Sequence, residues 1–221
     1  MSTGVRAVVA EALGTALLLA VVVGSGIMGE RFAGGNVAIA LLANSLATGF
    51  GLAALILVFA PISGAHFNPL VTIVAASRRE LPWRAVAPYL LAQFAGALLG
   101  VAAADAMFGE PLFALATKVR TGPAQWWSEA VATFGLILVI VRCASEGFRI
   151  VAPAVGAYIA AAYWFTASTS FANPAVTIAR ATTDTFTGIR PGDVAAFLFA
   201  QGVGACAAAI TVRWLDPARR E

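Results

Sequence analysis

Long apolar runs separated by short polar segments make up most of this chain. Six of the runs are long enough to cross about 30 Å of hydrocarbon and predict membrane-spanning helices. They are Ala7–Met28, Val37–Ala60, Ala85–Phe108, Trp126–Arg142, Ile150–Phe165 and Val194–Val212. Two uncharged stretches, between Phe32 and Ser77 and from Ile150 to Ala179, are longer than one crossing needs. Each surplus predicts a further short segment that re-enters the membrane.

Composition supports a membrane protein with little loop. Of the 221 residues, 14 are Lys or Arg and 11 are Asp or Glu, while 60% are hydrophobic. The mean hydropathy is +0.86. A soluble fold cannot bury so much apolar surface, which excludes a cytosolic enzyme and a nucleic-acid binder. The basic residues are scattered over short loops, and we interpret the first apolar run as a retained span rather than a cleaved leader.

The distribution of basic residues predicts the orientation of the chain. With a cytoplasmic N-terminus, nine fall inside and five outside, which favours two cytoplasmic termini in the cell inner membrane. The inside set is Arg6, Arg78, Arg79, Arg84, Arg142, Arg149, Arg213, Arg219 and Arg220, and the outside set is Arg31, Lys118, Arg120, Arg180 and Arg190.

The two halves of the chain resemble each other. Three matches occur in the same order, at offsets of 118, 105 and 108 residues. They pair Glu11–Thr15 with Glu129–Thr133, Asn68–Ile73 with Asn173–Ile178, and Ala92–Gln93 with Ala200–Gln201. Since each half holds three spans, the second copy must enter the membrane from the opposite side. We expect a single domain over 1–221, with repeat 1 at about 1–108, a connecting loop at about 109–124 and repeat 2 at about 125–221.

Each Asn-Pro pair predicts the start of a short helix. Asn is a favoured N-cap, and Pro at the first helical position lacks only an N–H that would be unpaired. The expected helices, Pro69–Ser77 and Pro174–Thr182, cover about half a bilayer at about 1.5 Å per residue. Half-helices occur at membrane depth only where protein packs around them or where they line an aqueous cavity. The pattern therefore predicts a cavity between two opposed helix N-termini, which repels cations.

The motifs Ser63–Pro69 and Phe171–Ala175 resemble those of the aquaporin, or major intrinsic protein, superfamily, and the resemblance covers essentially the whole chain. It implies an all-α membrane fold of six tilted helices and two re-entrant half-helices, with one pore per subunit and usually four subunits. It also implies a passive, non-enzymatic channel for small neutral solutes in a lipid bilayer, without cofactor or metal. The residues that would form the pore motifs are Asn68, Pro69, Leu70, Asn173, Pro174 and Ala175.

The resemblance gives other residues expected roles. Glu11 and Glu129 would hold the re-entrant segments by accepting backbone hydrogen bonds. Leu70 replaces a more usual Ala and would either narrow the junction or repack it. His66 is the sole histidine, so it cannot build a metal site alone, and we favour a packing and hydrogen-bonding role beside the pore over a pH gate.

The outer selectivity filter is expected, by counting from the Asn-Pro motifs, at Thr48, Ala161, Ser170 and Val176. Most family members carry Arg where this chain has Val176. The expectation is a wide, neutral filter lacking Arg and without an aromatic residue, unless a register shift of two brings in Phe50.

The departure at this position resembles bacterial aquaglyceroporin-like channels linked to arsenic resistance. It implies passage of glycerol-like polyols, metalloid hydroxides such as arsenite, methylated arsenicals, and water. The alternatives are an orthodox water channel and, less favoured, an ion-coupled secondary transporter, which would need a titratable site at mid-membrane. Ser63 and His66 lie three residues apart on one irregular segment and do not support a catalytic dyad.

Overall fold

The computed structural model describes residues 4–215, and all the regular secondary structure in that range is helical. Six long helices there are apolar enough to cross a membrane. They are α1 (Val5–Phe32), α2 (Val37–Ser63), α4 (Val86–Phe108), α5 (Pro123–Cys143), α6 (Phe148–Phe165) and α8 (Pro191–Leu215). Two short helices, α3 (Pro69–Ser77) and α7 (Pro174–Ala179), follow the two Asn-Pro pairs. The predicted six spans and two re-entrant half-helices are confirmed.

The observed helix ends differ from the predicted ones in understandable ways. Helix α1 runs to Phe32 because the small residues near its end do not break it. Helix α2 continues past Pro61 and ends where Gly64 adopts a left-handed conformation with φ of 94°. The second half-helix changes after Ala179 into the 3₁₀ turn η3 (Arg180–Thr182). Two further 3₁₀ turns, η1 (Trp83–Ala85) and η2 (Ala144–Glu146), flank α4 and α5. Arg219 and Arg220, which contributed to the predicted orientation, lie outside the described residues.

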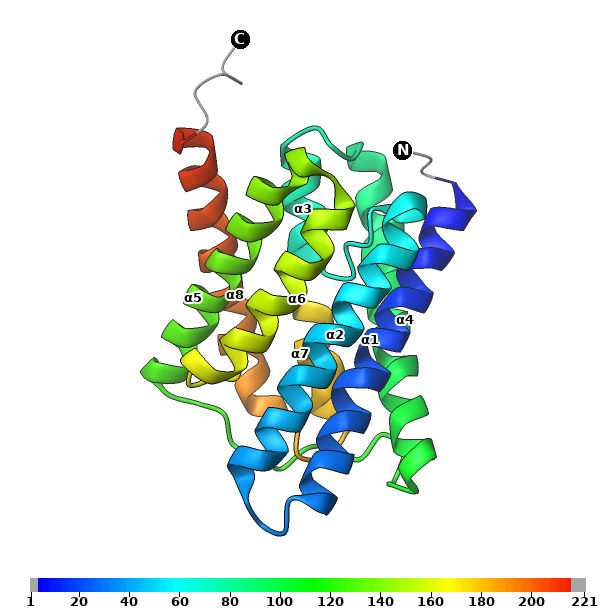
Figure 1. Cartoon of the computed structure of the whole chain (residues 1–221), viewed down its shortest axis with the longest axis vertical. Helices are drawn as coiled ribbons and strands as arrows, with labels where there is room; N and C mark the ends of the chain where they lie inside the picture. The colour runs from blue at the N-terminus through cyan, green and yellow to red at the C-terminus, as the bar shows by residue number, and fades with distance from the viewer. Residues whose placement is uncertain (1–3, 216–221) are drawn as a thin grey trace.

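The two halves of the chain are inverted relative to each other. In Figure 1, the start of α1 and the end of α8 lie at the same, upper end of the bundle. The half-helix α3 occupies the upper half of the bundle and α7 the lower half (Figure 1). Each half-helix therefore begins near mid-bundle and runs outward, so their N-termini point toward each other.

Equivalent small residues bring the helices of each half together. A Cβ atom on Gly96 of α4 would lie 2.2 Å from the carbonyl oxygen of Ala12 in α1. A Cβ atom on Gly204 of α8 would lie 2.2 Å from the carbonyl oxygen of Ala130 in α5. Since no real Cβ fits at that distance, both crossings depend on glycine, as is common where membrane helices approach closely.

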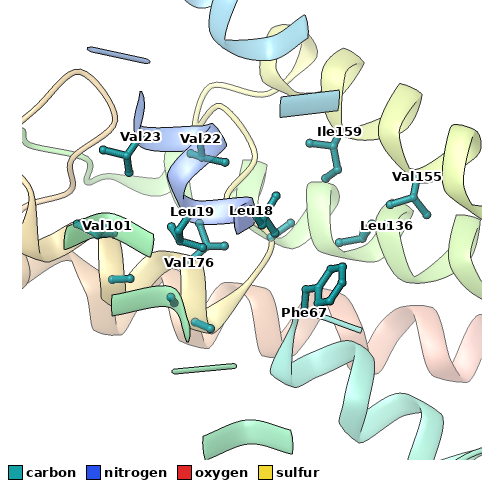
Figure 2. Close-up of a cluster of buried hydrophobic side chains, with 14 of the residues drawn as sticks. Leu18, Leu19, Val22, Val23, Phe67, Val101, Leu136, Val155, Ile159 and Val176 are labelled. Carbon is teal, nitrogen blue, oxygen red and sulfur yellow. The ribbon is translucent and has the colours of Figure 1, made fainter. Parts of the chain in front are cut away.

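The largest hydrophobic cluster lies between the two halves and borders an open space. Figure 2 shows Leu18, Phe67, Leu136 and Ile159 pointing toward a common region. These four residues line the central cavity described below. The core thus forms the apolar wall of a pathway as well as holding the helices together.

Candidate functional site

At the middle of the bundle, each asparagine donates a hydrogen bond to the segment that leads into the opposite half-helix. The Asn68 Nδ2 donates to the carbonyl oxygen of Ala172 at 2.8 Å, and the Asn173 Nδ2 donates to that of Phe67 at 2.8 Å. Each Oδ1 meanwhile caps its own half-helix, accepting from Leu70 N at 3.0 Å and from Ala175 N at 3.0 Å. An amide NH₂ has two N–H donors. One on each asparagine is used by the opposite half, which leaves a second for a molecule in the cavity.

The segments that lead into the half-helices have an unusual backbone that follows the internal repeat. Ala65 and Phe67 have φ of 52° and 50°, and their equivalents Ser170 and Ala172 have φ of 50° and 49°. Non-glycine residues adopt this left-handed region at a cost of about 1–3 kcal/mol each. The surrounding contacts must therefore hold both segments in place.

Glu11 and Glu129 supply those contacts. Glu11 accepts from His66 N at 2.9 Å and Phe67 N at 2.8 Å, and from the Ser63 hydroxyl at 2.6 Å. Glu129 accepts from the backbone N–H groups of the other lead-in, Phe171 N at 2.8 Å and Ala172 N at 2.9 Å. Both acids are fully buried.

A glutamine in each half completes the carboxylate environment. Gln93 donates to Glu11 at 2.8 Å and to Thr72 at 2.9 Å. Gln201 donates to Glu129 at 2.6 Å and to the equivalent threonine, Thr177, at 2.8 Å. These contacts are those expected of residues that brace the lead-in segments. Both carboxylate oxygens of each glutamate already accept hydrogen bonds, whereas a proton carrier would have to expose them.

His66 packs at the edge of the pathway. Its Nδ1 lies 3.1 Å from the Thr72 Oγ1, and its ring centroid lies 5.5 Å from that of Tyr89. Residues 4–215 contain no group of three or more His, Cys, Asp or Glu side chains that could hold a metal ion. The arrangement agrees with a packing and hydrogen-bonding role.

The other motif residues support the junction from behind. Pro69 and Ala175 are buried, and Pro174 is half-buried. Leu70 is half-buried and packs against a separate cluster that includes Val71 and Ile137. Leu70 does not line the cavity, so of the two roles considered for it the structure shows repacking.

A cavity of about 320 Å³ passes both asparagines. Toward one end of the bundle its wall includes Glu80, Val141 and Phe148, and toward the other it includes Thr48 and Tyr163. Most of the wall is aliphatic, and its polar residues include Glu80 and His66 as well as the two asparagines and those at the second end. A small molecule in this cavity would meet hydrogen-bond donors at mid-bundle against an apolar background.

The structure brings together three of the four expected filter residues. Thr48, Ser170 and Val176 line the cavity. Ala161 does not: it is exposed on the outer face of α6. Tyr163 lines the cavity instead, with its hydroxyl 3.3 Å from the Thr48 Oγ1. Two residues correspond to about 200° of rotation around a helix, which explains the exchange.

Phe50 does not provide the aromatic group either. Its side chain is 73% exposed on α2 and points away from the bundle. Tyr163 and Phe171 are aromatic residues that line the cavity at this end, and counting from the motif missed Tyr163.

Sequence reasoning also missed Arg180. This residue lies four positions after Val176, at the start of η3, and is only 2% exposed although it lines the cavity. Its Nε donates to the carbonyl oxygen of Thr187 at 2.5 Å, and its guanidinium carbon lies 3.4 Å from the centroid of the Phe171 ring. The expected neutral filter without Arg thus differs from the structure, because an arginine one helical turn further along reaches the same cavity. The spacing of four was the available signal.

Comparisons with known proteins agree with this geometry. The family described as Major intrinsic protein matches residues 1–147. The chain is 53% identical over 215 residues to aquaglyceroporin AqpS of Rhizobium meliloti (strain 1021), covering 97% of this chain and 92% of that protein. It is 33% identical over 195 residues to aquaporin NIP2-3 of Zea mays, covering 83% and 62%. The X-ray structure of the aquaglyceroporin from Plasmodium falciparum superposes with a TM-score of 0.69 at 25% identity, covering 94% of each chain.

Proposed function

Since this chain belongs to the major intrinsic protein family and is a multi-pass membrane channel rather than an enzyme, we propose that it conducts small neutral hydroxylated solutes. These are glycerol-like polyols, metalloid hydroxides such as arsenite, methylated arsenicals, and water. The observation that carries the proposal is the reciprocal pair of asparagines, each lining the cavity and keeping one N–H for a solute oxygen. The similarity to a protein named as an aquaglyceroporin supports the polyol class.

The proposed route places the asparagines at mid-membrane and a filter at the outer end. Two half-helix N-termini each contribute about half a positive charge there, which disfavours cations and orients solute oxygens toward the amides. The proposed filter consists of Thr48, Tyr163, Ser170 and Val176, with a further residue considered below. Val176 leaves one side of it uncharged and aliphatic, which suits methyl-bearing or carbon-rich solutes.

A second function, an orthodox water channel, is favoured by one observation. Tyr163 is an aromatic side chain in the filter region and its hydroxyl lies close to Thr48, which limits the room available. The ratio of glycerol to water permeability separates the two functions. An ion-coupled transporter is disfavoured, because Glu11 and Glu129 are committed to the lead-in segments.

The wider arrangement is part of the same proposal. We propose one channel domain over 1–221, made of repeat 1 at about 1–108 and repeat 2 at about 125–221, in the cell inner membrane with both termini cytoplasmic. We also propose a homotetramer. Large apolar side chains on the outer faces, such as Phe50, Leu91 and Phe199, suit contact with lipid or neighbouring subunits.

Stopped-flow light scattering of proteoliposomes tests the proposed function. Wild-type protein should accelerate glycerol and As(OH)₃ entry over empty liposomes, and Val176→Arg should lower both by about tenfold because it adds bulk and charge at the cavity wall. Val176→Leu adds bulk without charge and should retain more of the flux. Equal glycerol and arsenite entry in wild type and Val176→Arg would contradict the filter assignment, and no entry in wild type would contradict the function.

A further inference from the structure

Arg180 is a buried cation that has no carboxylate partner among the residues described by the structure. It forms no ion pair within residues 4–215, although buried charges in proteins are usually paired. Its hydrogen bond to the protein uses Nε alone, with the Thr187 carbonyl oxygen as acceptor. Because the side chain lines the cavity, its two terminal nitrogens are available to whatever occupies that space.

The guanidinium is held rather than free to swing. Phe171 stacks against it at 3.4 Å, and Phe171 N is itself tied to Glu129. Thr187, whose carbonyl oxygen accepts from Arg180, also places its Oγ1 3.4 Å from the Oγ1 of Thr185. The geometry at this end of the cavity is therefore built by several elements.

A second polar group on the same cavity wall also lacks a partner within residues 4–215. The Ser170 Oγ is buried, belongs to a residue lining the cavity, and has no hydrogen-bond partner within the described part of the chain. Ser170 precedes Phe171, the residue on which Arg180 stacks. Leaving a buried hydroxyl or guanidinium N–H without a partner is costly, so both groups suit a ligand that brings oxygen atoms.

The loop at this end of the bundle adds positive potential. Desolvation, together with repulsion by Arg120 and Arg180, lowers the pKa of Lys118 to about 8. Burial likewise lowers the pKa of Arg120 to about 10. An inorganic cation approaching this end meets three like charges in a partly dehydrated site.

We propose that Arg180 and Ser170 form a solute-oxygen binding subsite that excludes cations at the outer end of the pathway. The subsite takes small molecules with acceptor oxygens, and Arg180 is its specificity-determining residue. It supplies a charge that Val176 cannot, from one helical turn further along the chain. The inference rests on the proposed function, since it needs a conducting pathway.

The test compares methylammonium, a small cation, with glycerol in the same proteoliposomes. Arg180→Met should raise methylammonium entry about 100-fold, because a unit charge a few ångströms away in a partly desolvated site controls access to that degree. Arg180→Lys should keep the exclusion, because it keeps the charge. The matched control is Arg190→Met, which removes a half-exposed arginine paired with Asp193 and outside the cavity wall.

Glycerol entry separates failure of this inference from failure of the function. A variant that still conducts glycerol is folded, and Arg180→Gln provides a second neutral substitution if Arg180→Met does not reconstitute. Glycerol entry with wild-type exclusion of methylammonium in either neutral variant would overturn the role of Arg180. Equal leak in Arg180→Lys and Arg180→Met would overturn the role of its charge. Absence of glycerol entry in wild type would instead contradict the proposed function.

Discussion

Replacing Asn173 with Asp changes a single atom at the junction of the half-helices. The Oδ1 that caps α7 can remain, because a carboxylate oxygen accepts the same bond from Ala175 N. The Nδ2 becomes an oxygen facing the Phe67 carbonyl oxygen at the 2.8 Å now spanned by a hydrogen bond. A donor is thus replaced by an acceptor with negative charge in a site that is 6% exposed.

The expected cost follows from three contributions. Loss of the bond leaves a buried acceptor unsatisfied at about 1–3 kcal/mol. Burial of the carboxylate costs several kcal/mol more of folding free energy if it finds no new partner. Attraction between the carboxylate and the positive N-terminal end of α7 stabilises the variant by about 0.3–2 kcal/mol. We expect a net destabilisation of about 2–4 kcal/mol at neutral pH, with reduced entry of glycerol and increased entry of cations.

Thermal unfolding in detergent and proteoliposome flux measure these two effects. Asn36→Asp is the matched control: Asn36 caps α2 at the surface, accepting from Ala38 N at 3.0 Å, and Asp performs that task equally well. Its change should stay within about 0.5 kcal/mol. Asn68→Asp should behave like Asn173→Asp, because its Nδ2 makes the equivalent bond. If Asn173→Asp matched Asn36→Asp in stability and in flux, the reciprocal junction would have no role in the pathway.

Two further predictions concern a helix crossing and the filter. Gly204→Ala should destabilise the protein by about 1–3 kcal/mol, because the new Cβ would lie 2.2 Å from the Ala130 carbonyl oxygen. In Gly202→Ala, on the same helix, the new Cβ meets nothing within 4 Å and should not destabilise the protein. Equal melting temperatures for the two variants would contradict the close crossing. Tyr163→Phe removes the hydroxyl 3.3 Å from the Thr48 Oγ1 and should lower the free energy of unfolding by about 0.5–1.5 kcal/mol. It should also raise glycerol entry relative to water entry. An unchanged ratio of glycerol to water permeability would show that Tyr163 does not set the width of the filter.

The half-helices were predictable from sequence because their signals are local. Asn followed by Pro specifies both a cap and the first helical residue, and Pro69–Ser77 was placed with both ends correct. The bracing role of Glu11 and Glu129 was implied by the resemblance to the family, and their symmetric positions in the repeat favoured it over a proton relay. Signals of this kind do not depend on how neighbouring helices rotate.

The filter was less predictable because it depends on helix rotation and on side-chain reach. Counting from Asn173 reached Ala161, but a difference of two residues turns the helix by about 200° and brings Tyr163 to the cavity. Reading a single position after the second motif found Val176 and overlooked Arg180. A long arginine side chain can extend past a helical turn of about 5.4 Å, so its charge need not lie where its backbone does.

The reciprocal asparagine bonds also bear on how the chain is made. Neither amide has its partner carbonyl until both Phe67 and Ala172 are in place, 105 residues apart along the chain. The first half leaves the ribosome before the second exists, so its lead-in must wait in an incomplete state within the membrane. Assembly of the junction is consequently a late event in biogenesis. Each lead-in segment reaches its final conformation only when the other half is present to bond with it.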